Sequence, residues 1–175
     1  MAKVVLFGGP AGAGKSTLAR AWCATRERAA HVELDRVRQL VVQGLADPQR
    51  PGELQEEQYA LSVEATCALA RAFADGGYDV AVDDVLEPDA FERHWRPALA
   101  GLDWDVVIVL PSLEETLARS RGRGKRVLEA HTRSQHAACS RWPAAHRIDT
   151  TGLTVEESLR LLQERGSGRS GSRSP

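Results

Sequence analysis

The chain has 175 residues, a length that predicts one domain able to bury a core of its own. Its 23 basic and 24 acidic side chains give a net charge of −1, so no overall field favours nucleic acid or an acidic membrane. The sequence has no apolar run of about 18 residues and no signal peptide, so neither membrane spanning nor secretion is expected. Its three cysteines form no C-x-x-C pair, and a reducing, cytoplasmic location is expected.

A glycine-rich turn lies near the amino terminus. Residues 3–7 before it predict a buried strand, and residues 15–28 predict a helix. From Gly9 to Ser16 the turn reads G-x-x-x-x-G-K-S, the phosphate-binding loop pattern. Such a loop turns its N–H groups inward, where they and the positive end of the helix hold an anion. The residues predicted to bind nucleotide are Gly9, Pro10, Ala11, Gly12, Ala13, Gly14, Lys15, Ser16 and Thr17.

Two side chains of this loop have their own expected roles. Lys15 is expected to reach the β- and γ-phosphates of ATP and to act in catalysis. The Ser16 hydroxyl is expected to hold Mg²⁺. The alternative is a strand-to-helix turn that binds nothing, but the strand, the full spacing, the lysine and the serine together favour ATP and Mg²⁺.

The rest of the chain alternates between strands and helices. Strands are predicted at 31–34, 78–82, 104–110 and 147–149. Helices are predicted from 36, at 53–75, at 88–100, from 112, at 127–140 and at 154–165. The first of these helices has Val37, Leu40 and Val41 on one face, and the second has Leu54, Tyr59 and Leu61 among its apolar positions. Capping boxes, Ser112 with Glu115 and Thr154 with Glu157, mark two helix starts. The order predicts an α/β fold, a parallel sheet with helices on both faces, in a single domain over residues 1–165. The Gly/Ser/Arg tail 166–175 is expected to be disordered.

Three carboxylates follow predicted strands, at the edge where such sheets bind ligands. Asp35 could accept or orient the proton of an attacking hydroxyl, and its alternative role is a helix cap. Asp83 and Asp84 end the next strand, where only one of two successive side chains should meet a metal. Asp83 is predicted to hold Mg²⁺, with Asp84 on the substrate side or capping; a turn-forming pair is the alternative.

Basic side chains gather later in the chain, at Arg119, Arg121, Arg123, Lys125 and Arg126. Glycines on either side of Arg123 would permit hinge motion, so the segment of about 119–140 is predicted to be a lid. Arg123 and Arg126 are predicted to stabilise the transferring phosphoryl group, with Arg133 as a further candidate. A solvated surface is the alternative. Arg36 and Arg38 could contact an anionic substrate or be exposed helix charges.

Five segments carry a resemblance to a known family: the loop 9–16, Leu34-Asp35, the run 82–85, the segment 119–126 and the ending 148–151. In these segments the chain resembles the small P-loop kinases (the AAA_33-like group). These include the shikimate- and gluconate-kinase type and, more closely, the chloramphenicol phosphotransferase-like family. The resemblance covers residues 4–162. It implies a three-layer α/β/α P-loop NTPase fold with a five-stranded sheet of order 2-3-1-4-5 and a mobile lid. It also implies transfer of the γ-phosphoryl group of ATP·Mg²⁺ to a small-molecule hydroxyl, with Asp35 as base and adenine near Arg119 and 150–152. The acceptor, an antibiotic or another metabolite, stays open.

Two other functions would use the same loop. One is a nucleotide-dependent switch or ATPase acting on a protein partner; the sequence lacks the Asn-Lys-x-Asp guanine motif and is short for an AAA-type motor. The other is a polynucleotide 5′-kinase. The near-neutral net charge and the lack of a basic–aromatic platform in the sequence disfavour this function. The sequence therefore favours a small-molecule kinase without a membrane or nucleic-acid partner.

Overall fold

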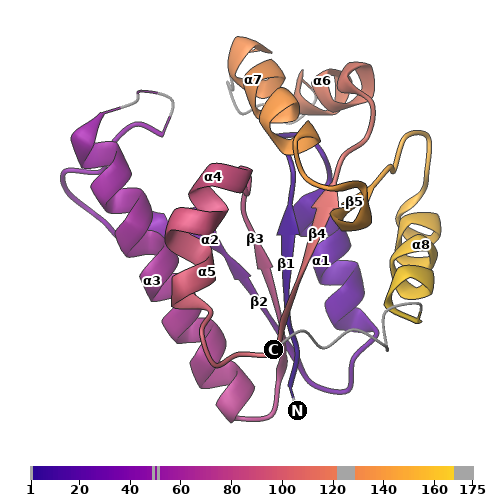
Figure 1. The fold of residues 1–175 in the computed structure, drawn as a ribbon, viewed down its shortest axis with the longest axis horizontal. Helices are drawn as coiled ribbons and strands as arrows, with labels where there is room; N and C mark the ends of the chain where they lie inside the picture. The colour runs from indigo at the N-terminus through magenta and orange to yellow at the C-terminus, as the bar shows by residue number, and fades with distance from the viewer. Residues whose placement is uncertain (1, 49, 51, 122–128, 168–175) are drawn as a thin grey trace.

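The structure is a computed structural model that describes residues 2–48, 50, 52–121 and 129–167. Five strands form one sheet in the order β2-β3-β1-β4-β5, with every neighbouring pair parallel (Figure 1). Their bounds are β1 Val4–Gly8, β2 Ala29–Glu33, β3 Asp79–Asp83, β4 Trp104–Val109 and β5 Arg147–Ile148. The predicted α/β class and strand order are confirmed.

The helices cover both faces of this sheet. Their bounds are α1 Lys15–Ala24, α2 Leu34–Arg38, α3 Glu53–Asp75, α4 Pro88–Ala90, α5 Arg96–Ala98, α6 Leu113–Arg121, α7 Glu129–Ser140 and α8 Val155–Ser167, with a π-helical turn η1 Phe91–Trp95 and a 3₁₀ turn η2 Ala144–His146. Among the described residues, no helix combines the length and the apolar character needed to cross a bilayer.

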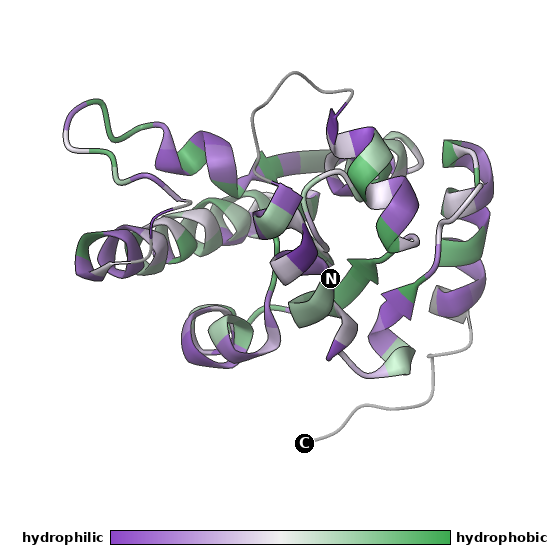
Figure 2. Cartoon of the chain, turned by 90° about the horizontal axis from the view of Figure 1, so that it is seen from above, coloured by the Kyte–Doolittle hydropathy of each residue, from purple (hydrophilic) through white to green (hydrophobic). Residues whose placement is uncertain are grey.

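Alternation along the strands divides the core into two apolar layers. Val4 and Leu6 of β1 face one layer, which includes Val63 of α3 and Trp95 of η1. Phe7 faces the other layer, formed largely by α1 and α8. Successive strand residues point to opposite faces, which is why both sets are buried. Figure 2 shows the molecule from above, looking onto the carboxyl ends of the strands. In Figure 1, α6 and α7 lie at this end of the sheet.

Two predicted helix ends were wrong. The helix predicted to reach Arg28 ends at Ala24, because β2 begins at Ala29 rather than at His31 and the Asp79 N–H already donates to the Arg28 carbonyl at 3.0 Å. The second predicted helix stops at Arg38, and Leu40, predicted on its apolar face, is 73% exposed. The segment between α2 and α3 projects from the body of the molecule (Figure 2).

The helix predicted at 88–100 is interrupted by the π-helical turn η1, in which the Arg96 N–H donates to the Phe91 carbonyl. A regular helix would press the Pro97 ring against the carbonyl of Arg93 and leave that carbonyl without a donor. The wider turn relieves this crowding and lets Trp95 point into the core, where it is fully buried.

The last helix continues to Ser167, past its predicted end at Arg165. The predicted tail is therefore wrong in its first two residues, 166 and 167, and its remainder, 168–175, lies outside the described residues. The start of the helix predicted at 127 also lies outside them, and α7 is described from Glu129.

The two predicted capping boxes differ in their outcome. Thr154 and Glu157 form the reciprocal pair, with the Thr154 N–H donating to Glu157 Oε2 at 2.8 Å and the Glu157 N–H to Thr154 Oγ1 at 3.2 Å. At the other box the Glu115 N–H donates to Ser112 Oγ at 3.3 Å, but the Ser112 N–H donates to Thr151 Oγ1 instead of to Glu115. The Glu115 carboxylate binds Arg119 and the Gly152 N–H instead.

Replacing Thr154 with Ala should lower the free energy of unfolding by about 1 kcal/mol, because the Glu157 N–H at the start of α8 loses its acceptor. Chemical denaturation measures this change. Thr154→Ser, which keeps the hydroxyl, is the control and should stay close to the parent protein. A Thr154→Ala protein as stable as Thr154→Ser would contradict the capping role.

Candidate functional site

The glycine-rich loop is held tightly between β4 and α6. A Cβ on Gly9 (φ 140°) would lie 2.2 Å from the Val109 carbonyl oxygen, and one on Gly12 (φ 88°) would lie 2.6 Å from that of Thr116. Neither position tolerates a side chain. Among the described residues, no partner accepts a hydrogen bond from the N–H groups of Gly12, Gly14, Lys15 or Ser16. These free donors stand at the start of α1, where a phosphate group is best held.

Lys15 is half-buried beside the same loop, and its Nζ donates to the Pro10 carbonyl at 3.0 Å. Burial lowers the pKa of its ammonium group below the ordinary value, while Asp83 and other nearby carboxylates favour the charged form. A lysine ammonium group at this place on the loop is a donor of the kind that binds a phosphate.

Asp83 lies beside Ser16 because β1 and β3 pair in parallel, with Phe7 opposite Asp83. The Ser16 hydroxyl donates to Asp83 Oδ2, and His31 Nε2 lies 3.2 Å from Asp83 Oδ1. Burial favours protonation of Asp83, but the hydrogen bonds from His31 and Ser16 and the charge of Lys15 hold its pKa below the ordinary value. The hydroxyl and the ionised carboxylate are oxygen donors of the kind that Mg²⁺ prefers.

Magnesium keeps several water or phosphate ligands when it binds at a phosphate site, so two protein oxygens suit it. The described residues contain no group of three or more His, Cys, Asp or Glu side chains arranged for a metal. His31 had no signal in the sequence beyond its place on a strand next to β3.

A cavity of about 520 Å³ opens over this part of the loop. Its wall brings together Lys15, Ser16, Asp35, Asp83 and Asp84, although they come from separate parts of the chain. Asp35 is exposed at the start of α2, and its carboxylate makes no hydrogen bond or ion pair with any described residue. A hydroxyl compound in this cavity would thus meet the carboxylate of Asp35 as well as Lys15 and Ser16.

Asp84 points into a buried polar chain that the sequence did not reveal. The Tyr59 hydroxyl donates to Asp84 Oδ2 at 2.7 Å and accepts from Trp95 Nε1–H at 3.0 Å. Burial raises the pKa of Asp84 above its ordinary value, against the lowering effect of Tyr59. Tyr59 was predicted only as an apolar helix position. A buried tyrosine needs a partner for its hydroxyl, and that was the available signal.

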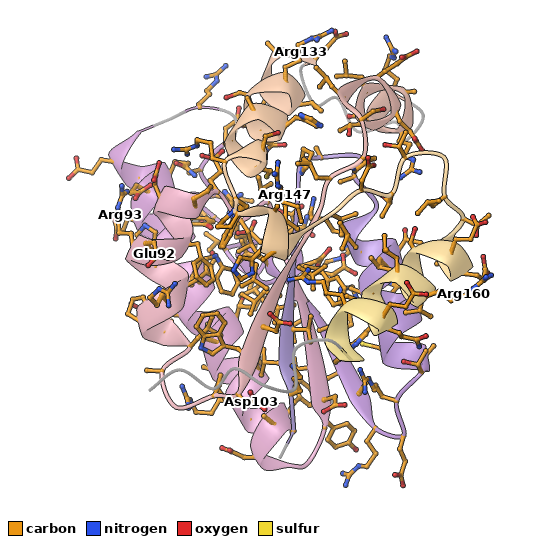
Figure 3. The ribbon with its side chains drawn as sticks, turned by 45° about the vertical axis from the view of Figure 1, so that its right-hand side comes forward. Glu92, Arg93, Asp103, Arg133, Arg147 and Arg160 are labelled. Atoms are coloured by element: carbon orange, nitrogen blue, oxygen red, sulfur yellow. The ribbon has the colours of Figure 1, made fainter. Side chains whose placement is uncertain are left out.

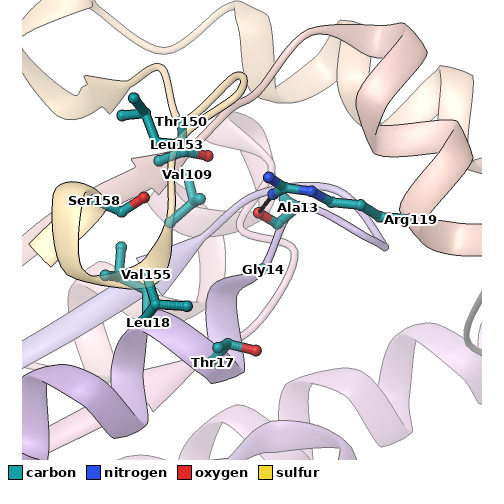
Figure 4. A pocket seen from close by; sticks show the side chains of 10 residues that line it. All are labelled: Ala13, Gly14, Thr17, Leu18, Val109, Arg119, Thr150, Leu153, Val155 and Ser158. Atoms are coloured by element: carbon teal, nitrogen blue, oxygen red, sulfur yellow. Dashed lines mark hydrogen bonds between the residues drawn. The ribbon is translucent and has the colours of Figure 1, made fainter.

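A second cavity, of about 370 Å³, lies along the loop between α1, α8 and the segment after β5 (Figure 4). Gly14, Thr17, Arg119 and Thr150 are among its lining residues, so it lies where the resemblance implies adenine. Arg119 Nη1 donates to the Ala13 carbonyl at 3.4 Å, and its Nη2 pairs with Glu115. The Glu115 carboxylate also accepts from the Gly152 N–H at 2.8 Å, which links α6 to the segment after β5.

The predicted lid is described only at its ends. Arg123 and Arg126, the predicted catalytic arginines, lie outside the described residues and stay predictions. Arg133 is half exposed, pairs with Glu129 at 2.7 Å, and points outward from α7 in Figure 3. It lines neither of the two cavities.

Arg38 differs from its neighbour Arg36. The Arg36 side chain is 71% exposed, as expected of a helix charge, whereas Arg38 is only 8% exposed and lines the larger cavity. Its Nη2 donates to the Ala46 carbonyl at 3.4 Å, and its Nε has no partner among the described residues. An exposed-charge interpretation is therefore wrong for Arg38.

Comparisons with known proteins agree with this arrangement. The AAA_33 family model, described as an AAA domain, matches residues 4–142. No curated protein sequence matches the chain.

Several solved structures share the fold. The tunicamycin resistance protein of Deinococcus radiodurans has a TM-score of 0.69 at 19% identity, covering 100% of this chain and 99% of its own. A sugar kinase from Janibacter sp. has a TM-score of 0.70 at 16% identity, covering 95% of each chain. The APS kinase of Mycobacterium tuberculosis, in complex with AMPPNP and APS, has a TM-score of 0.65 at 19% identity, covering 95% of this chain and 98% of its own. At these identities the likeness shows a shared fold and leaves the activity to be argued from the site.

Proposed function

The chain belongs to the AAA_33 family of AAA domains, and we propose that it is an ATP-dependent kinase that transfers the γ-phosphoryl group to a hydroxyl of a small molecule. One observation carries this proposal. The larger cavity has Lys15 and Ser16 on its wall together with the free carboxylate of Asp35, while a separate cavity on the loop can take the nucleobase. A phosphate-binding loop alone would serve any nucleotide-binding protein; the facing carboxylate and a closed space for an acceptor are features that a kinase needs.

Each part of the site has a role in this reaction. The loop N–H groups and Lys15 bind the β- and γ-phosphates, and Asp35 accepts the proton of the acceptor hydroxyl as its oxygen attacks the γ-phosphorus. The bond from that phosphorus to the β,γ-bridging oxygen breaks, and ADP leaves. Ser16 and Asp83 would hold Mg²⁺, which would supply charge neutralisation at the phosphates.

Two measurements test the proposal in sequence. Calorimetry with ATP and ADP in the presence of Mg²⁺ should give saturable binding to the full chain. Incubation with ATP·Mg²⁺ and a pooled library of alcohols, sugars and antibiotics should then give the mass gain of one phosphoryl group on an acceptor. ATP hydrolysis that ignores every added small molecule but is stimulated by a protein would favour the switch alternative.

Arg119 should contribute to nucleotide affinity, because it lies across the smaller cavity and contacts the loop through Ala13. Arg119→Ala should raise the Kd for ATP about tenfold, the loss expected of a guanidinium packed on an aromatic base or hydrogen-bonded to it. Arg160→Ala on the outer side of α8 (Figure 3) is the matched control. Equal affinities of the two variants in calorimetry would show that Arg119 does not contact the nucleotide.

A further inference from the structure

The acceptor end of the larger cavity carries an excess of negative charge. Beyond the phosphate-binding residues, its wall includes the carboxylates of Glu33, Asp35, Glu56, Asp84 and Glu87. Arg38 lies among these lining residues, and Lys15 and His131 line the same cavity. A solute in the cavity therefore meets mostly acceptor oxygens, and the charge it experiences depends on which of these carboxylates are already neutralised.

Two of them are. Glu33 pairs with Arg20 and lies 3.9 Å from Arg36. Glu56 pairs with Arg93 at 2.8 Å and lies 3.0 Å from His94. These carboxylates hold neighbouring helices together and have little charge left for a ligand.

The other three carboxylates form no ion pair within the described part of the chain, although Asp84 and Asp35 interact electrostatically with Lys15. The side chains of Asp35 and Glu87 make no hydrogen bond there, and the Asp84 carboxylate accepts from two neutral donors, the Tyr59 hydroxyl and the Val85 N–H. Arg38 and Lys15 offset part of this negative charge, and the phosphates would take up the charge of Lys15 once nucleotide binds. The remaining negative charge lies in a half-enclosed space, where charge–charge interactions are stronger than in water.

The segment that carries Asp84 and Glu87 is fixed in place. Leu86, between them, has a φ of 52° and is the described non-glycine residue with a positive φ. Its carbonyl accepts from the Trp142 indole N–H at 2.7 Å, and the Val85 carbonyl accepts from the Gly9 N–H at 2.9 Å. Strained backbone held from both sides is typical of a site that must present particular side chains.

Arg38 adds an independent requirement. Its side chain is more than nine-tenths buried, and its Nε donates to no described residue. Arg38 lines the cavity, and its guanidinium group donates to the Ala46 carbonyl at a long 3.4 Å, so a ligand that supplies an oxygen to this group is favoured. A bound metal does not explain the acidic wall, because the described carboxylates form no cluster with metal-ligand geometry.

We propose that the acceptor is an amine-bearing polyhydroxylated compound, of the amino-sugar or amino-alcohol class, bound in its ammonium form. The ammonium group lies against Asp84 and Glu87, a hydroxyl faces Asp35, and an uncharged oxygen lies at Arg38. The inference rests on the proposed kinase function and adds the substrate class. Anionic acceptors, including the 5′ end of a polynucleotide, meet repulsion from the same wall.

The test uses matched acceptors that differ in charge. Glucosamine, galactosamine and a deoxystreptamine aminoglycoside are each compared with their N-acetylated forms, and glucuronate and galacturonate supply the anionic members. Calorimetry measures binding to the full chain loaded with a non-hydrolysable ATP analogue and Mg²⁺, and mass spectrometry scores phosphoryl transfer from ATP. At least one amine should bind and gain a phosphoryl group, and N-acetylation should weaken its binding about tenfold or more, since it removes a charge-assisted contact.

A preference for N-acetylated or anionic members, or no amine binding to a protein that does bind ATP, would overturn the inference. Phosphorylation of a neutral or anionic member would leave the proposed kinase function standing while the substrate class failed. Absence of ATP binding would instead overturn the function itself.

A pair of variants localises the effect. Glu87→Gln should lower kcat/KM for the preferred amine about tenfold and change that for its N-acetylated form little. Glu92→Gln, which alters a solvent-exposed carboxylate paired with Arg96 outside the cavity, is the control and should match the parent protein. Equal losses on the amine and its N-acetylated form in Glu87→Gln would also contradict the proposal.

Discussion

Lys15→Ala should lower the rate of phosphoryl transfer by a factor of roughly 10²–10³ or more, the loss measured when one preorganised donor to transition-state charge is removed. The side chain is half-buried at the loop, and its one hydrogen bond within the described residues goes to the Pro10 carbonyl. Its removal therefore leaves the fold largely undisturbed and takes away the charge that would meet the γ-phosphate. ATP affinity should also fall, by roughly 10–100-fold, because a charge-assisted contact to phosphate is lost.

Single-turnover kinetics and calorimetry measure the two losses separately. Lys3→Ala is the matched control, because it removes the same group from an exposed position just before β1. Thermal unfolding of both variants checks that each is folded. Parent-like transfer by Lys15→Ala would exclude the loop from the chemistry and with it the proposed kinase function.

Asp35→Ala should separate chemistry from nucleotide binding. The carboxylate is free of partners among the described residues and lies on the wall of the larger cavity, away from the nucleobase cavity. Loss of a general base lowers kcat by a factor of roughly 10²–10⁴, whereas the Kd for ATP should stay close to that of the parent protein. Asp35→Asn should behave similarly, since an amide cannot accept the proton.

Asp89→Ala provides the comparison, because Asp89 is an exposed carboxylate of α4 whose partner is Arg141 at 2.9 Å. Its kinetics should match those of the parent. Full turnover in Asp35→Ala would show that the acceptor is oriented or deprotonated by another group, and a large loss of ATP affinity would place Asp35 on the donor side instead.

Local signals in the sequence were sufficient for the elements that form the frame of the site. The helix 53–75 was found with its predicted bounds, because its length and the Gly76-Gly77 stop leave little freedom. The loop pattern, with a strand before it and a helix after it, located the first edge of the site. The strand order came from the family resemblance.

Contacts between distant segments were not predictable in the same way. Leu54 and Leu61 have helical spacing with the core residues of α3, yet they are 54% and 57% exposed, because the sheet and η1 cover only one side of that helix. The burial of Arg38 depends on the segment that follows α2, and the Tyr59–Asp84 hydrogen bond joins residues from α3 and the end of β3. A periodic pattern describes one helix and carries no information on which carboxylate it will meet.

The two cavities lie at different parts of one loop, one beside Arg119 and the other over Asp35. If they hold the two substrates, neither molecule has to pass through the space that the other occupies. Such an enzyme has no structural reason for a compulsory sequence of arrivals. Nucleotide and alcohol could then join the free protein in either order.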